Sequence, residues 1–463
     1  MERAEKIIKQ LDQIVWGAGM LALLLGTGCY LMIRLGFLPL RNLKAALLCA
    51  IGRDKASEQK KEEGREAGIS SFSSLMTELA ATIGTGNIVG VATAMVLGGP
   101  GALFWMMLSS VAGMATKLVE SMLAVKYREK NQSGEYVGGP MYTMKNAFPG
   151  SRFFTALGML FAVFAVLASF GMGNMTQSNS IAAAIKVTFG VHEAKTGLVI
   201  GILTILAVLG GIRTISRVTQ VLVPVMGVFY MAGALTVILF HAGNVPGGIV
   251  GILQGAFCPE AVGGGLFGSV TVSVMEAFRW GISRGVFSNE AGLGAAGISA
   301  AAADTKDYIK QGYISMTGVF LDTIVICSVT GLALAASGVL GAVDERGEPL
   351  AGTALTIAAF ATTFGKWGAF FICICITLFA FATIVGWAYQ GEKAFEFLVG
   401  NTRYCIFYRF FYGLVSYVGA LCALEVVWDF SDICNALMAL PNLICVLALS
   451  GKACRELKAA GRP

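Results

Sequence analysis

Apolar residues recur along the chain in long blocks, and short polar or charged segments separate these blocks. A helix needs roughly 17–25 apolar residues to cross the hydrocarbon core of a bilayer. Blocks of this length predict about eleven transmembrane helices, near residues 14–34, 75–98, 101–125, 153–185, 197–212, 216–240, 262–283, 312–338, 367–390, 405–425 and 431–450. We therefore expect an all-α integral membrane protein.

Two of the predicted helices contain glycine-rich interruptions. Residues 75–98 include GTGN at 84–87, which places two helix-weakening glycines and two polar side chains in an apolar helix. Residues 262–283 begin with several glycines, followed by Ser269 and Thr271. Unwound backbone inside a membrane has to face a cavity or a ligand, so both segments are predicted binding elements. The alternative is close helix packing, because 59 glycines are spread over the whole chain.

The interrupted helices also divide the chain. After one extra helix at the front, ten helices remain, and the interrupted ones begin two sets of five that run in opposite directions. Paired interruptions of this kind are typical of inverted-repeat transporters with a midplane binding site. The predicted regions are an N-terminal helix with a cytoplasmic linker, two inverted repeats and a cytoplasmic tail, at residues 1–72, 73–241, 262–450 and 451–463.

Composition supports the membrane class, and the distribution of charge predicts the orientation. The chain is 56% hydrophobic and only 13% charged, with a net charge of +6. With the N-terminus outside, the inner loops 34–72 and 126–152 hold eight and five basic residues, whereas the outer loops 242–261 and 426–432 hold none. Basic residues favour cytoplasmic loops. We expect a multi-pass protein of the cell membrane with its C-terminus in the cytoplasm, embedded in membrane lipid.

Several other classes of function find no support in the sequence. The basic residues lie in loops and form no stripe interleaved with aromatic residues, which argues against nucleic-acid binding. The two histidines are far from any cysteine or carboxylate cluster, and none of the eleven cysteines forms a CxxC pair. A channel would need a continuous polar stripe or a charged ring. We expect neither an enzyme nor a channel, and nothing indicates an obligate protein partner.

Two further helices carry polar or aromatic groups that suit a binding site. Asn174 and Gln177 share a helical face within the polar stretch 173–180, and Thr383 lies one turn before Trp387. The alternatives are hydrogen bonds between helices for the polar residues and a place in the interfacial aromatic belt for Trp387.

Charged residues inside or beside the apolar blocks predict a gate. The stretch 279–292 contains Arg284 and Glu290, and two arginines deep in a bilayer would be costly. We therefore place this stretch at the cytoplasmic end, where Arg284 and Glu290 would form a gate. Lys117 and Glu120, three residues apart, are expected to pair. Asp322 has no local partner, and it is interpreted as either a proton-coupling group or a structural acid.

Five stretches together resemble the alanine or glycine:cation symporters, also called the sodium:alanine symporter family. They are GTGNIVGVATA from 84, GGPGALFWMMLSSVAG from 98, GGPMYTM from 138, GNMTQSNSIA from 173 and SRGVFSNEAGLG from 283. The resemblance implies a leucine-transporter-type fold, in which one extra helix precedes a 5+5 inverted repeat. It also implies sodium-coupled uptake of alanine or glycine by alternating access. Proton-coupled amino-acid symport, through Asp322 or Glu78, is the alternative.

The resemblance implies positions for both ligands. The amino acid would be held by Thr85, Gly86, Asn87, Gln177 and Trp387, and the polar residues Ser269, Thr271 and Thr383 complete the predicted pocket. The co-transported sodium ion would lie between the first and eighth core helices, at Asn87, Thr383 and the carbonyl groups of Gly84 and Phe379. The family pattern has two adjacent hydroxyl residues at this ion. Here Ala382 replaces one of them, so the carbonyl groups would have to contribute more.

Overall fold

The computed structural model describes residues 10, 15–52, 69–257, 273–344, 347–422 and 424–462. Within these ranges, seven helices or helix pairs are long and apolar enough to cross a membrane. They span Ala102–Lys126, Arg152–Phe189, Gly211–Phe240, Tyr308–Ser337, Trp367–Val399, Thr402–Leu421 and Val427–Ala460. The sheet in the described residues is a small hairpin of β1 (Glu129–Lys130) and β2 (Tyr136–Val137). The prediction of an all-helical membrane protein is confirmed.

The first predicted interruption is present. Helix α6 (Ser71–Thr82) ends at Ile83, a short 3-10 turn η1 (Thr85–Asn87) follows, and helix α7 (Val89–Leu97) continues the span. Gly84 is fully extended, with φ −136° and ψ −151°, so the chain leaves the helix at this glycine. The polar residues of the break are buried, which places free backbone groups inside the protein and away from lipid.

A break that was not predicted lies between α15 (Val274–Asn289) and α16 (Ala295–Ala301), beyond the predicted helix 262–283. Helix α15 is separated from helix α16 by Glu290–Gly294. Glu290, Gly292 and Gly294 have φ values of 58°, 90° and 82°, which end one helix and turn the chain into the next. The predicted interruption at 263–273, including Ser269 and Thr271, lies almost entirely outside the described residues. The predicted helix end at 283 was wrong.

Two π-helical segments interrupt other long helices. Segment η2 (Gly171–Met175) joins α10 (Arg152–Phe170) to α11 (Thr176–Phe189), and η4 (Phe320–Cys327) joins α17 (Tyr308–Val319) to α18 (Ser328–Ser337). A π-turn adds a residue to the helix and is frequent at functional sites. Segment η4 places Asp322 beside the first break, and Gln177, which follows η2 in α11, also reaches it.

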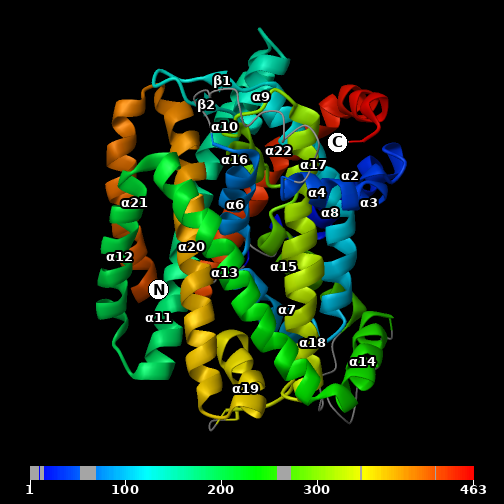
Figure 1. Ribbon diagram of the computed structural model, residues 1–463, viewed down its shortest axis with the longest axis vertical. Helices are drawn as coiled ribbons and strands as arrows, with labels where there is room; N and C mark the ends of the chain where they lie inside the picture. Colours follow the sequence, from blue (N-terminus) through cyan, green and yellow to red (C-terminus); the bar gives the residue numbers. More distant parts are fainter. Residues whose placement is uncertain are drawn as a thin grey trace.

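The remaining helices surround these broken elements. They are α2 (Ala18–Arg34), α3 (Leu38–Arg41), α4 (Leu43–Ala50), α8 (Ala102–Lys126), α9 (Pro140–Ala147), α12 (Glu193–Leu209), α13 (Gly211–Phe240), η3 (Ala242–Asn244), α14 (Val245–Phe257), α19 (Gly352–Phe364), α20 (Trp367–Val399), η5 (Thr402–Tyr404), α21 (Cys405–Leu421) and α22 (Leu424–Ala460). In Figure 1 the long helices run roughly along one axis, with α6, α7 and α20 in the middle of the bundle.

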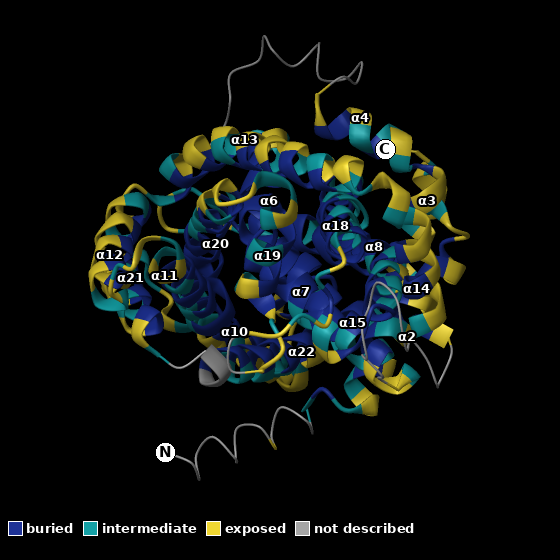
Figure 2. Cartoon of the chain, turned by 90° about the horizontal axis from the view of Figure 1, so that it is seen from below, coloured by how far each residue is buried: buried dark blue, intermediate teal, exposed yellow. Residues whose placement is uncertain are grey.

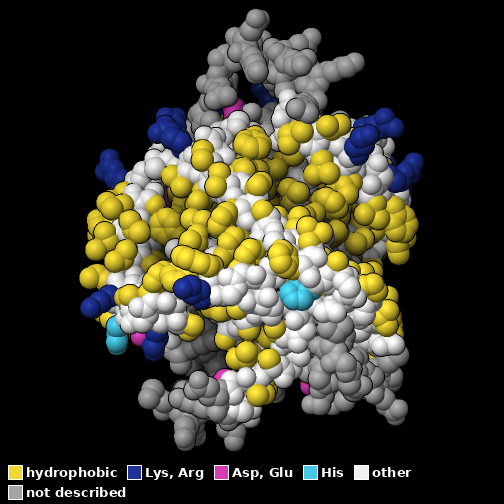
Figure 3. Space-filling view, turned by 60° about the horizontal axis from the view of Figure 1, so that its bottom comes forward, with side chains coloured by type: hydrophobic (Ala, Val, Ile, Leu, Met, Phe, Trp, Pro, Cys, Tyr) yellow, Lys and Arg dark blue, Asp and Glu magenta, His cyan; other side chains and the backbone are white. Residues whose placement is uncertain are grey.

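Burial follows the same arrangement. Seen along the bundle, α7, α20 and α6 are mostly buried, whereas α12, α13 and α21 present exposed faces at the edge (Figure 2). Those exposed faces are apolar, and they include Leu206 and Val228 at 63% and 71% exposure. Figure 3 shows hydrophobic side chains over the broad middle of the molecular surface. An apolar exterior, with polar side chains buried inside the bundle, suits a lipid bilayer.

Candidate functional site

Gln177 holds the first break from the side of α11. Its Oε1 accepts hydrogen bonds from the backbone N–H of Thr85 at 3.2 Å and from Thr85 Oγ1 at 3.0 Å. Its own Nε2 donates to the carbonyl of Met172 at 3.0 Å, across the π-helical turn. Both Thr85 and Gln177 are buried. The N-terminal end of α7 is thus bound by a neutral side chain that offers one oxygen.

The other polar residues near Gln177 do not face the break. Asn174 Nδ2 donates to the carbonyl of Tyr412 at 2.7 Å, and Asn179 Nδ2 donates to the carbonyls of Gly419 and Cys422 at 3.1 and 2.8 Å. The prediction that Asn174 and Gln177 share a face was wrong, because the π-helical turn changes the angular spacing there. Asn174 and Asn179 bind α11 and η2 to α21, as polar residues in membrane helices commonly do.

Thr383 approaches the same break from α20. Its Oγ1 lies 3.1 Å from the carbonyl oxygen of Phe379 and 3.5 Å from that of Ile83. The approach is so close that a Cβ on Gly84 would lie 2.3 Å from Thr383 Oγ1. Ala382 beside it is buried and supplies only a methyl group. Three oxygens from two helices therefore meet here, and the carbonyl on the α6 side belongs to Ile83.

Asn87 connects the break to a different group of residues. Its Oδ1 accepts from the backbone N–H of Gly84 at 2.9 Å, and its Nδ2 donates to Asp322 Oδ1 at 2.7 Å. Asp322 Oδ2 accepts from Ser288 Oγ at 2.8 Å and from Thr323 Oγ1 at 2.7 Å. The sequence showed no partner for Asp322 because two of the three groups that bond to its carboxylate, Asn87 and Ser288, come from distant segments. Within the first break, the polar side chain of Asn87 was the signal in the sequence that a polar partner lies nearby.

Trp387 and Glu290 meet between α20 and the second break. Trp387 Nε1 donates to Glu290 Oε1 at 2.7 Å, and both side chains are 0% exposed. A Cβ on Gly173 would lie 2.4 Å from Trp387 Cβ, so the indole packs directly against the π-helical turn. Trp387 is therefore a core residue, which contradicts the alternative of a place in the interfacial aromatic belt. The ring thus connects the second break, through Glu290, to the π-helical segment η2.

Arg284 pairs with a residue that the sequence did not single out. Its Nη2 lies 2.5 Å from Asp432 Oδ2, and its Nη1 lies 3.3 Å from Oδ1. The guanidinium lies 4.8 Å from the ring centre of Trp428, and it also faces Trp280 and Phe287. Arg284 is buried in α15, which continues to Asn289, so residues 279–289 are helical. An ion pair to α22, surrounded by aromatic rings, lowers the cost of burying this charge.

Lys117 connects both broken helices. Its Nζ lies 3.2 Å from Glu78 Oε1 on α6 and donates to the carbonyl of Asn289, the last residue of α15, at 2.8 Å. Glu120 instead accepts from Asn442 Nδ2 at 2.9 Å. The expected pair between Lys117 and Glu120 was therefore wrong. A cation at the C-terminal end of α15 is favoured by the helix dipole.

The start of α6 and the end of α16 are also held together. Arg128 donates to the carbonyls of Ala301 and Thr305 at 2.9 and 2.6 Å, and its guanidinium lies 3.7 Å from the ring centre of Tyr136. Ile69 donates to the carbonyl of Ala302 at 3.2 Å. The end of the molecule that carries the β-hairpin is therefore closed by bonds between the start of the first broken helix and the end of the second.

An ion-pair cluster also lies at the end of the molecule that carries the β-hairpin. Lys393 Nζ is 2.8 Å from both Glu135 Oε2 and Glu396 Oε2. Burial raises the pKa of Glu135, but the adjacent Lys393 outweighs this effect and holds the pKa below its ordinary value. Glu135 is therefore charged at neutral pH, and the pair ties the hairpin loop to α20.

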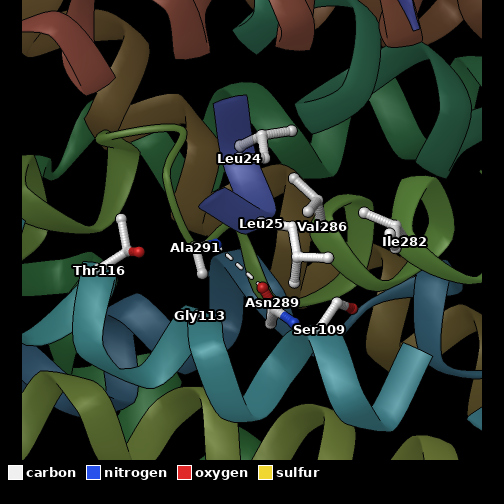
Figure 4. A pocket seen from close by; sticks show the side chains of 9 residues that line it. All are labelled: Leu24, Leu25, Ser109, Gly113, Thr116, Ile282, Val286, Asn289 and Ala291. Atoms are coloured by element: carbon white, nitrogen blue, oxygen red, sulfur yellow. Dashed lines mark hydrogen bonds between the residues drawn. The ribbon is translucent and has the colours of Figure 1, made fainter. Parts of the chain in front are cut away.

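A small cavity adjoins the second break. It has a volume of about 20 Å³, room for about one water molecule, and α2, α8 and α15 line it. Figure 4 shows Leu24 and Leu25 of α2 across this cavity from Ser109 of α8, with Asn289 between them. Asn289 Oδ1 accepts from the backbone N–H of Ala291 at 2.9 Å. The extra N-terminal helix thus covers the side of the second break.

Comparison with known proteins gave matches to sodium-coupled amino-acid symporters over nearly the whole chain. The profile of the sodium:alanine symporter family matches residues 1–460. The sodium/alanine symporter AgcS of Methanococcus maripaludis is 44% identical over 456 residues, which cover 98% of this chain and 96% of that protein. The probable sodium/glutamine symporter GlnT of Bacillus subtilis is 35% identical, with coverage of 96% and 88%.

Two solved structures share the fold. MhsT in complex with L-phenylalanine has a TM-score of 0.62 at 14% identity, and it covers 83% of this chain and 90% of that chain. A Na⁺-coupled sialic acid symporter in its substrate-bound outward-open state has a TM-score of 0.53 at 12% identity, with coverage of 96% and 98%. The likeness shows a leucine-transporter-like arrangement of helices.

Proposed function

Because this chain belongs to the sodium:alanine symporter family, we propose that it carries alanine or glycine into the cell together with sodium, by alternating access. Membership makes the protein a sodium-coupled amino-acid symporter of the membrane and not an enzyme. The observation that supports the finer proposal most is the buried break at Ile83–Asn87. Gln177, Thr383 and Asp322 reach it from three different helices.

We assign the substrate to the space between the two breaks. The carboxylate of the amino acid meets the N-terminal end of α7, where the N–H and hydroxyl of Thr85 are positioned by Gln177. Gly86 and Asn87 allow close backbone approach there. The ammonium group meets Glu290, whose Oε2 has no hydrogen-bond partner among the described residues. Trp387 limits the remaining space, which favours short side chains. Ser269 and Thr271 stay predictions outside the described residues.

Sodium is assigned to the oxygen cluster between α6 and α20. The carbonyl oxygens of Ile83 and Phe379 and Thr383 Oγ1 provide three hard oxygen groups beside Gly84. Backbone carbonyls freed at a helix break suit a sodium ion. Ala382 cannot contribute, so carbonyl groups dominate this set. An ion there would hold α6 against α20 and so order the break before the amino acid binds.

Two closed ends supply the gates of an alternating-access cycle. The pair of Arg284 and Asp432 ties α15 to α22 on one side of the breaks, and Arg128 ties α16 to the hairpin loop on the other. We propose that the Arg284–Asp432 pair faces the outside and that the Arg128 contacts face the cytoplasm. This places the N-terminus outside and the C-terminus in the cytoplasm. Residues 73–241 and 262–450 would then be the inverted repeats that move against each other.

The first test compares the driving ions. Purified protein in proteoliposomes is expected to accumulate alanine or glycine when a sodium gradient is imposed, and to do so at least tenfold faster than with a pH gradient of the same size. The measurement is uptake of the radiolabelled amino acid, with each gradient imposed separately. Uptake that follows the pH gradient and ignores sodium would favour the proton-coupled alternative.

The second test concerns the amino-acid pocket. Thr85→Ala and Gln177→Ala are each expected to weaken apparent affinity about 10- to 100-fold, because each removes a hydrogen bond beside the substrate carboxylate. Uptake is measured against substrate concentration. Thr236→Ala serves as the control, since this exposed hydroxyl bonds only within α13. Wild-type affinity in both pocket variants, at normal yield of folded protein, would remove Thr85 and Gln177 from the pocket.

A further inference from the structure

An open hollow lies at the end of the molecule that carries the β-hairpin. It has a volume of about 360 Å³, and ligand pockets in proteins usually measure about 300–1,000 Å³. Two segments far apart in the sequence line it: the end of α8 with the hairpin that follows, and the connection between α16 and α17. The described residues assigned above to the amino acid and to sodium do not line it. The hollow is therefore separate from the transport site.

The lining of the hollow is strongly basic. It contains the carboxylate of Glu129 and four cationic side chains, those of Lys126, Arg128, Lys130 and Lys306. Outside the lining, Lys145 pairs with Glu129 at 2.9 Å, and Glu456 pairs with Lys126. Asp304 also interacts with Arg128. These described groups comprise five positive and three negative charges, so two positive charges are in excess and the hollow favours an anion.

Neutral groups orient the Arg128 guanidinium beside the hollow. It donates to two backbone carbonyls at and beyond the end of α16, at 2.9 and 2.6 Å, and it lies 3.7 Å from the ring centre of Tyr136. Carbonyl oxygens and a ring face hold a guanidinium without supplying a full negative charge. Lys130 Nζ lies 5.0 Å from the same ring centre, and Lys126 Nζ lies 4.9 Å from the ring centre of Tyr308. The two tyrosines thus gather three cations around the hollow.

The hollow lies where membrane-spanning helices end. The span Ala102–Lys126 ends in its lining, and the span Tyr308–Ser337 begins there. The two helices pack closely, and a Cβ on Gly312 would lie 2.8 Å from the carbonyl oxygen of Leu118. Tyrosine is enriched at this depth, and basic pockets between membrane helices bind anionic lipid headgroups. The hollow therefore opens at the level of the lipid phosphates.

We propose that this hollow binds a phosphate group, and that the headgroup of an anionic phospholipid in the adjacent leaflet supplies it. Lys130 belongs to the hairpin and Lys306 to the connection between α16 and α17, so a phosphate bound by both would join these two segments. Arg128 already ties the same segments together, so the lipid would stabilise this closed end of the molecule. The proposal depends on the membrane placement of the two spans and is independent of the amino acid that is carried. A free phosphate ion has the same chemistry, and the experiment separates the two sources.

The test is a thermal-shift titration of the purified full-length protein in a neutral detergent. Phosphatidylglycerol is expected to raise the unfolding temperature, whereas phosphatidylcholine with the same acyl chains, which has no net charge, should need at least tenfold more lipid for the same shift. The double variant Lys130→Gln with Lys306→Gln, called the hollow variant, removes two exposed positive charges. It is expected to need at least tenfold more phosphatidylglycerol than the wild type.

Lys195→Gln with Lys366→Gln is the matched control. Both lysines are exposed, and they lie at the start of α12 and directly after α19, at the opposite end of the bundle from the hairpin (Figure 1). This pair removes the same charge, and its response to phosphatidylglycerol should stay within twofold of the wild type. An unchanged response in the folded hollow variant, or an equal loss in the control, would overturn the site.

Two further measurements complete the test. Lys306→Arg, which keeps the charge, should respond like the wild type, and Lys306→Gln alone should lose at least threefold, so the proposal stays testable if the hollow variant is unstable. An equal loss in Lys306→Arg would contradict a site that recognises charge. Inorganic phosphate is titrated against sodium chloride of the same ionic strength. If it stabilises the wild type as strongly as phosphatidylglycerol does, and the hollow variant loses this effect, the site takes free phosphate and the lipid assignment is wrong.

Discussion

Gly84→Ala is expected to reduce sodium-driven uptake at least hundredfold. The added Cβ would lie 2.3 Å from Thr383 Oγ1 and 3.2 Å from Gln177 Oε1, and both of these atoms belong to the proposed ligand sites. The backbone of Gly84 is extended, with φ −136°, a conformation that alanine also adopts. The effect is therefore steric: α20 and α11 would have to move away from the break. The measurement is uptake as a function of sodium and amino-acid concentration.

Gly90→Ala provides the control for this variant in the adjoining half-helix α7. The nearest atom to a Cβ at Gly90 is the carbonyl oxygen of Thr85 at 3.9 Å, an ordinary contact. Alanine also favours a helix by about 1 kcal/mol over glycine, so this variant should fold at least as well as the wild type. Near-normal uptake by Gly84→Ala would show that Thr383 and Gln177 do not need to approach the break closely.

The first break could be predicted from the sequence, whereas the second could not. At residues 84–87 the glycines, the polar residues and the break coincide, so local chemistry locates it. In the second half of the chain, the glycines at 263–268 predicted an interruption well before the observed break at Glu290–Gly294. The charged residues there suggested a position at the cytoplasmic end, because a sequence shows the cost of burying Arg284 but not its partner Asp432, which is 148 residues away.

The same limit explains the errors over polar clusters. Spacing predicted that Lys117 pairs with Glu120, but tertiary packing brings Glu78 to Lys117 and Asn442 to Glu120. Helical periodicity placed Asn174 beside Gln177, but it assumed 3.6 residues per turn and so missed the π-helical segment. The sequence indicates which polar residues lie within the membrane-spanning helices. Their partners depend on how the helices pack.

Removal of one member of the Arg284–Asp432 pair is expected to destabilise the protein strongly. The side chains are 5% and 2% exposed, so Arg284→Met would leave an unpaired carboxylate in the core. Loss of one partner from a buried ion pair typically costs about 3–5 kcal/mol, whereas replacing both with neutral groups of similar size costs much less. We therefore expect Arg284→Met and Asp432→Asn each to lower the unfolding temperature, and the double variant to regain most of the loss.

The control and the functional measurement separate stability from gating. Lys145→Met breaks a pair with Glu129 in which the side chains are 50% and 35% exposed, and such a pair contributes only about 0–1 kcal/mol. The thermal shift of purified protein is measured for all four variants. If the pair only stabilises the fold, the double variant should transport normally once its stability returns. If it is the outer gate, the stable double variant should still exchange substrate abnormally, because the ion pair no longer holds α15 to α22 when the outside is closed. Equal thermal shifts for Arg284→Met and Lys145→Met would show that the buried pair is not important for stability.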